Sequence, residues 1–243
     1  MKVAFALILW LWTAAAVHAD EGLPAAASAN GPGMMVVGPN PADMNSTQPI
    51  QGSIIVNTRD MGNRWSHVQN TDAMDVTAEF SSEDGAAYRV IINKPMPRHP
   101  LGRYTTWFGV VYWHEMHGNT GIGASTIPKV KPDIALWGWA EISKDGQVIG
   151  RMVPAHVMVM TQPPMQGIML EIATEDKDLP GVADGYITAM WPTVATISLP
   201  TAHVYRRRTV GWVALVAIVL LFGGLILAER RRDGARNEAR RSV

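Results

Sequence analysis

The sequence predicts a mostly β protein, an antiparallel sandwich or partly open barrel, followed by one C-terminal transmembrane helix. Three observations lead to this fold class. Apolar and polar residues alternate strictly along residues 74–81, which is the period of a strand with one buried face. Short turns containing Gly and Asp separate similar runs, as in β-hairpins. Residues 210–228 form one apolar run without a charge.

The strand pattern predicts two hairpins, one turning at Glu83–Gly85 and the other at Lys144–Gly146. No window of the body outside the apolar run carries a helical stripe, so turn-separated strands account for the domain. Two long connections, residues 94–103 and 117–133, are candidates for binding because ordered loops on a rigid scaffold often carry function. The expected strands are Ser53–Asn57, Met74–Phe80, Ala87–Asn93, Thr105–His114, Ile134–Ser143, Gln147–Gly150, Val153–Thr161, Gly167–Ala173 and Thr193–Leu199.

Both ends of the chain predict export and membrane anchoring. Residues 1–19 read as a cleaved signal peptide, with Lys2, an apolar stretch and small residues before Asp20. Residues 20–52, rich in Pro and Gly, are expected to form an extended or poorly ordered lead-in to an exported β-domain over residues 53–205. Residues 209–229 are expected to form the transmembrane helix, because its apolar run spans ~28 Å at ~1.5 Å per residue.

The arginines around the apolar run predict its orientation. The tail, residues 230–243, carries six Arg, whereas three Arg at positions 206–208 precede the run. Basic residues concentrate on the cytoplasmic side of a membrane, and a cleaved signal also sends the N-terminal domain outward. We therefore expect a bacterial inner-membrane protein with one span, a periplasmic N-terminal domain and a cytoplasmic C-terminus. Its expected partners are the lipid bilayer, through residues 209–229, and an integral membrane protein.

Charge and cysteine content exclude several classes of function. Residues 20–205 hold 11 Lys and Arg against 18 Asp and Glu, a net charge of −7. An acidic body binds nucleic acid poorly, because phosphate affinity comes from Lys and Arg. The chain has no Cys, which removes disulfides, thiolate metal sites, iron–sulfur clusters and cysteine nucleophiles.

Methionine and histidine point to a candidate metal site, with copper as the possible cofactor. Thirteen of the 14 Met lie in residues 20–205, and thioether and imidazole ligands without thiolate suit copper, Cu(I) above all. The period of a strand places His156, Met158 and Met160 on one face. The competing interpretation is a strand buried on both faces, in which Met fills a core.

A second candidate group, His114, Met116 and His117, lies where an aromatic strand enters the long loop. If the strand runs through, His114 and Met116 share a face; if the chain turns, His114 and His117 approach one metal. Trp137 and Trp139 also share a strand face, where they either pack in the core or contact a sugar, a quinone or a partner.

Two functions are compatible with these features. The first is an accessory or interaction subunit of a bacterial membrane complex, since no catalytic constellation is found and we expect no enzyme. The alternative is a periplasmic copper-binding or copper-delivery module that uses His and Met ligands. In layout alone, the combination of a signal, a cysteine-free β-domain, one span and a basic tail resembles membrane-anchored periplasmic copper-handling and oxidase-accessory proteins.

Overall fold

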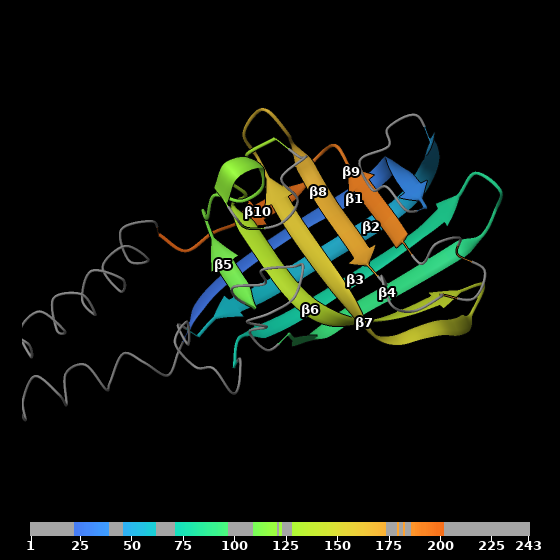
Figure 1. The fold of residues 1–243 in the computed structure, drawn as a ribbon, viewed down its shortest axis with the longest axis horizontal. Helices are drawn as coiled ribbons and strands as arrows, with labels where there is room; N and C mark the ends of the chain where they lie inside the picture. The colour runs from blue at the N-terminus through green and yellow to red at the C-terminus, as the bar shows by residue number, and fades with distance from the viewer. Residues whose placement is uncertain are drawn as a thin grey trace, which may run out of the picture. The chain divides into compact units, whose positions relative to one another are not determined.

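The computed structural model describes residues 22–38, 46–61, 71–96, 109–120, 122, 128–173, 179, 182 and 186–201. Almost all elements of these ranges are antiparallel strands (Figure 1). The strands are β1 (Leu23–Val37), β2 (Thr47–Asp60), β3 (Ala73–Ser82), β4 (Ala87–Pro95), β5 (Val110–Tyr112), β6 (Ile134–Lys144), β7 (Gln147–Met160), β8 (Gly167–Ala173), β9 (Tyr186–Trp191) and β10 (Thr196–Ser198). The 3-10 turn η2 (Gly118–Thr120) lies between β5 and β6.

The strands close into an eight-stranded barrel. Their order is β1-β2-β3-β4-β6-β7-β8-β9, and β9 pairs back with β1 through residues 187–190 and 34–37. The short strands lie off this ring, with β5 paired to β6 and β10 paired to the N-terminal half of β1. Of the two expected architectures, the structure is therefore a barrel, and it is closed rather than partly open.

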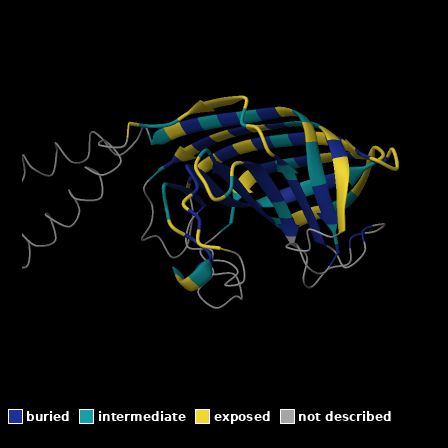
Figure 2. Cartoon of the chain, turned by 90° about the horizontal axis from the view of Figure 1, so that it is seen from above, coloured by how far each residue is buried: buried dark blue, intermediate teal, exposed yellow. Residues whose placement is uncertain are grey.

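The alternation of side chains divides the barrel wall into an inner and an outer face. Along β3 the burial follows the predicted period without exception, with Met74, Val76, Ala78 and Phe80 inward. Figure 2 shows the same banding of buried and exposed residues along β1–β4. The outer face of β2–β4 is mostly polar and exposed, with an ion pair between Glu79 and Arg89 and an exposed Ile55.

Both predicted hairpins are confirmed, β3–β4 around Gly85 and β6–β7 around Gly146. The two strands expected at 147–150 and 153–161 are one strand, β7, with shifts of register on either side of Arg151. Met152 has a positive φ of 54° there, which accommodates the extra residue of a bulge. The strand expected over Thr105–His114 is described only at Val110–Tyr112.

The prediction of a lead-in over residues 20–52 is wrong. Residues 23–37 form β1, a full member of the barrel paired to β2 along its whole length, and β2 begins at Thr47 rather than Ser53. Strand β9 was not expected at all, although it closes the barrel. Small residues at Ala25, Ala27 and Ala29 face the interior, which explains why β1 lacks the bulky alternation of a typical strand.

The predicted signal peptide, transmembrane helix (209–229) and tail lie outside the described residues. Within the ranges that the structure describes, no helix has the length and apolar character needed to cross a membrane.

Aromatic packing near one end of the barrel depends on a glycine of β2. A Cβ at Gly52 would come within 2.2 Å of the Glu79 carbonyl oxygen and 2.5 Å of the Phe80 Cα. The ring of Phe80 stacks on Tyr88 and meets Trp191 edge-on, with ring centres 5.2 and 5.7 Å apart. Trp191 Nε1 donates to the Gly52 carbonyl at 3.3 Å.

We expect Gly52→Ala to lower the free energy of unfolding by roughly 1–3 kcal/mol, because backbone atoms, which cannot swing aside, occupy the space of the new methyl group. Thermal unfolding of the full-length protein in detergent measures this change. The control Ser53→Ala alters the neighbouring outer-face residue and should stay within about 0.5 kcal/mol of the wild type. Equal unfolding temperatures for the two variants would show that β2 and β3 separate easily at this point.

Candidate functional site

The candidate site lies on the outer face of β6, β7 and β8, which form part of the near side of the barrel in Figure 1. Val157 pairs with Leu136 and Leu170, and these three side chains fill the barrel interior. The alternate residues therefore point outward. His156 lies between Trp137 and Glu171 in the register, and Met158 lies between Ala135 and Met169.

This outer face is buried, unlike the polar outer face of β2–β4. The segment that runs from β5 to β6 packs over it and contributes Val111, Met116, Ile122 and Val130 to one apolar cluster with the strand residues. Met116 and Val130 exchange backbone hydrogen bonds of 2.9 and 3.0 Å, which fold the segment back on itself. The parts of β6–β8 around Ala135, Trp137, Met158, Met160 and Met169 are thus covered on both sides.

Two imidazoles lie beside this apolar cluster, because His156 stacks on Trp137, a member of it, and His117 follows Met116 in the chain. We call the set formed by His117, His156, Met116, Met158, Met160 and Met169 the His/Met cluster. Its four methionines are between 0 and 6% exposed. The ring centres of the two histidines are 6.5 Å apart.

His156 is held in one orientation by two contacts. Its ring stacks on Trp137, with centres 4.4 Å apart and planes 16° from parallel. Its Nδ1 lies 2.8 Å from the Leu136 carbonyl oxygen. Burial lowers the pKa of His156 from 6.5 to about 3, against the opposing effect of that hydrogen bond and with a smaller lowering contribution from His117. The ring is therefore neutral.

The neutral ring of His156 has a defined tautomer. A carbonyl oxygen only accepts hydrogen bonds, so Nδ1 carries the hydrogen and donates it, and Nε2 carries a lone pair. Nε2 is buried and has no hydrogen-bond partner among the described residues. A buried polar atom of this kind costs about 1–3 kcal/mol unless something binds it.

A turn of the covering segment brings His117 to the cluster. His117 and Gly118 have positive φ angles of 63° and 57°. The backbone N–H of His117 donates to the Ile122 carbonyl at 2.6 Å, and its own carbonyl accepts from Thr120 Oγ1 at 2.8 Å. The imidazole is 4% exposed, and its Nε2 is buried.

The structure brings together five of the six residues proposed from the sequence: His156, Met158, Met160, Met116 and His117. His114 is half-buried, and its role as a ligand stays a prediction. The alternative in which the strand runs on through His114 is wrong, because β5 ends at Tyr112 and Trp113 has a φ of 53°. Sequence reasoning did not find Met169, which only the register of β7 and β8 places opposite Met158.

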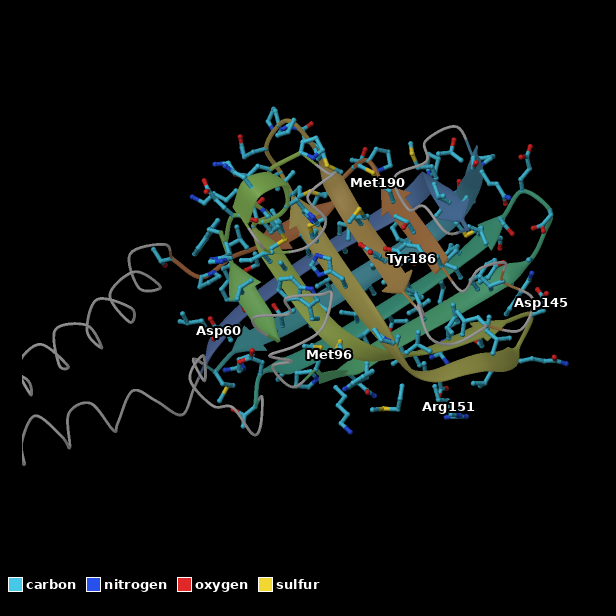
Figure 3. The ribbon with its side chains drawn as sticks, in the orientation of Figure 1. Asp60, Met96, Asp145, Arg151, Tyr186 and Met190 are labelled. Atoms are coloured by element: carbon cyan, nitrogen blue, oxygen red, sulfur yellow. The ribbon has the colours of Figure 1, made fainter. Side chains whose placement is uncertain are left out.

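Three polar side chains beside the cluster were also missed. Glu171 is the cross-strand neighbour of both His156 and Thr188, and the hydroxyl of Tyr186, at the start of β9 (Figure 3), donates to Glu171 Oε1. Burial raises the pKa of Glu171 from 4.5 to about 7. Tyr186 and Thr188 are 7 and 8% exposed. These side chains come together only through the register of β7, β8 and β9, and no local pattern in the sequence reveals that register.

The His/Met cluster contains only soft or neutral donor atoms that could bind a metal. The described residues contain no group of three or more His, Asp or Glu side chains placed to hold a metal ion. The chemistry available in the His/Met cluster is that of thioether sulfur and imidazole nitrogen. Comparison with protein-family models, curated proteins and solved structures finds no match for this chain.

The raised pKa of Glu171 predicts that the free energy of unfolding of the metal-free protein depends on pH. The folded state holds the proton up to about pH 7, whereas the unfolded chain releases it near 4.5. The stability that Glu171 contributes is complete below pH 4.5 and is lost as the pH rises through 7. Relative to Glu171→Gln, which keeps an acceptor for Tyr186 and cannot ionise, the wild type should lose roughly 1–3 kcal/mol across this window.

Chemical denaturation at several pH values between 4 and 8.5 measures the difference. Glu79→Gln provides the control, since Glu79 is 61% exposed and should leave the wild-type pH profile unchanged. Parallel profiles for the wild type and Glu171→Gln would mean that Glu171 is ionised in the folded barrel.

Proposed function

We propose that this protein is a membrane-tethered barrel module that binds Cu(I) in the His/Met cluster and serves as an accessory subunit of a bacterial membrane complex. The observation that carries the proposal is the Nε2 atom of His156, a buried lone pair without a hydrogen-bond partner among the described residues. Of the two functions compatible with the sequence, the geometry of this atom favours copper binding.

The surroundings of His156 resemble those of a metal-binding histidine. Metal-ligating histidines almost always donate their second ring nitrogen to a carbonyl or carboxylate, which fixes the tautomer and aims the other nitrogen at the metal. The contact from Nδ1 to the Leu136 carbonyl oxygen meets this condition. Stacking on Trp137 further restricts rotation of the ring, so little conformational freedom would be lost on binding.

The neighbouring thioethers select the metal. Met158 and Met160 follow His156 on the same strand face, and Met116 and Met169 join them in the same buried cluster. Sulfur of this kind is a soft ligand that prefers Cu(I), whereas Mg²⁺ and Ca²⁺ require oxygen ligands. A buried site of neutral ligands also favours an ion with a single charge, because the cost of desolvation rises with charge.

The distance between the histidines is slightly longer than one shared ion allows. Two imidazoles bound to one metal at ~2.0 Å have ring centres at most about 6 Å apart. The observed separation of 6.5 Å exceeds this value slightly, so the ring of His117 has to move closer to the fixed ring of His156 before both bind one ion. His117 and His156, with thioether sulfur from Met158 or Met116, therefore provide a ligand set for two- or three-coordinate Cu(I).

We expect the double variant Met158→Leu/Met160→Leu to weaken Cu(I) binding by about 10- to 100-fold, since leucine preserves the apolar volume and removes the sulfur ligands. The measurement is an anaerobic competition between the full-length protein in detergent and a chromophoric Cu(I) chelator. The control, Met35→Leu/Met74→Leu, makes the same two substitutions at buried positions inside the barrel.

The control separates loss of ligands from loss of stability. If both double variants unfold at similar temperatures and only Met158→Leu/Met160→Leu loses affinity, the His/Met cluster is the binding site. A wild-type protein that leaves Cu(I) with the chelator would contradict the proposal and leave apolar packing as the purpose of these methionines.

The accessory role rests on the sequence, since residues 209–229 lie outside the described residues. The apolar run and the arginine-rich tail support a single span with the barrel on the periplasmic side of the inner membrane. A barrel held at the membrane surface can exchange an ion with a neighbouring membrane protein without diffusing away, because tethering raises the effective concentration.

We expect the full-length protein, solubilised from membranes in mild detergent, to migrate on a blue-native gel at a mass well above that of its 26.5 kDa chain. Mass spectrometry of that band identifies the co-migrating membrane protein. A variant with Leu220→Arg and Leu221→Arg in the apolar run should lose the band and leave the membrane fraction, because each central arginine costs about 2.5–3.5 kcal/mol on insertion. Migration of the wild type as a monomer would contradict the accessory role alone.

A further inference from the structure

The His/Met cluster is closed to solvent in the structure. Met116 and Met158 are 0% exposed, Met160 is 2% exposed and His156 is 9% exposed. An ion that binds among these side chains therefore needs a path through the layer that covers them. The covering segment and the connection between β7 and β8 meet at one edge of the cluster, beside Met160.

A cavity of about 210 Å³ lies at this edge. Met160 and Val130 line the cavity and also belong to the buried cluster, so the two are contiguous. Met165 lines the cavity from the connection between β7 and β8, packs against the cluster, and is only half-buried. The thioether of half-buried Met165 thus lies at the outer side of the cavity, and that of buried Met160 lies at its inner wall.

A carboxylate is fixed in the wall of the same cavity. Asp133 lines it, and Asp133 Oδ2 accepts hydrogen bonds from Thr161 N at 2.9 Å and from Thr161 Oγ1 at 2.6 Å. These bonds hold the carboxylate in place at 8% exposure. A fixed negative charge in a cavity wall attracts a cation, and Lys131, an exposed residue that lines the same cavity, weakens this attraction.

We propose that this cavity is the port through which Cu(I) enters and leaves the His/Met cluster, with Met165 as the first thioether that the ion meets. The inference rests on the proposed copper function and adds a route to it. In each step a bond from Cu(I) to one soft donor breaks as a bond to the next donor forms. The ion passes from the donor that delivers it to Met165 and then to Met160, and no electron or proton is transferred.

If Cu(I) enters through this port, Met165 affects the rate at which the protein takes up Cu(I) and has little effect on its equilibrium affinity for Cu(I). The test follows anaerobic transfer of Cu(I) from its bicinchoninate complex to the full-length protein in detergent, by stopped-flow loss of the chelator colour. We expect Met165→Leu to load roughly ten times more slowly than the wild type, because the soft donor at the mouth is removed. Its equilibrium affinity should change less than about threefold, since the buried ligands remain.

The matched control is Met152→Leu. Met152 lies on β7, is 44% exposed and is not among the residues that line the cavity. Its substitution removes an accessible sulfur of the same kind and should leave both rate and affinity at wild-type values.

The outcomes distinguish the port from the site. If Met165→Leu loads at the wild-type rate, the port is wrong and the copper site stands. If Met165→Leu loses as much affinity as Met158→Leu/Met160→Leu, Met165 is a ligand of the final site, which also overturns the port. A wild-type protein that takes no Cu(I) from the chelator overturns the proposed copper function and the port together.

Discussion

The pairing of β9 with β1 is the constraint on which the rest of the structure depends. Residues 187–190 and 34–37 complete the ring of hydrogen bonds, and each of the eight ring strands then has a neighbour on both sides. In a closed wall every side chain points either inward or outward. Because Val157 and Leu170 face inward, His156, Met158 and Met169 must face outward. Their burial therefore requires a second layer, which the segment between β5 and β6 provides.

The fold was predictable where one face of a strand meets water. Strand β3 alternates apolar and polar residues because its outer face is solvated, and the hairpin to β4 ends in a turn with Gly85. Strand β1 lacks this contrast, since alanine occupies both faces along Ala25–Ala29. Small residues in that stretch resemble a linker, and only the pairing of β1 with β2 and β9 shows that it is a strand. Closure was not predictable either, because β1 and β9 lie near opposite ends of the barrel sequence and no local pattern records their pairing.

The candidate site was predictable only where its residues are neighbours along one strand. A period of two residues is local, so the common face of His156, Met158 and Met160 follows from the sequence alone. The approach of His117 depends on the return of the covering segment, fixed by the bridge between Met116 and Val130 and by the left-handed conformation of His117. Likewise, Glu171 becomes the neighbour of His156 only through the register of β7 and β8.

The energetics of His156 connect the fold to the proposed function. An apolar side chain of similar size at this position would pack against Trp137 without burying a lone pair, so the imidazole makes the metal-free barrel less stable by about 1–3 kcal/mol. A ligand that binds only the folded state stabilises that state in proportion to its affinity and concentration. Binding of Cu(I) at Nε2 would both satisfy the buried atom and stabilise the layer that covers it, since Met116 and His117 belong to that layer. The outer layer of the barrel and the occupancy of the site would then be thermodynamically coupled.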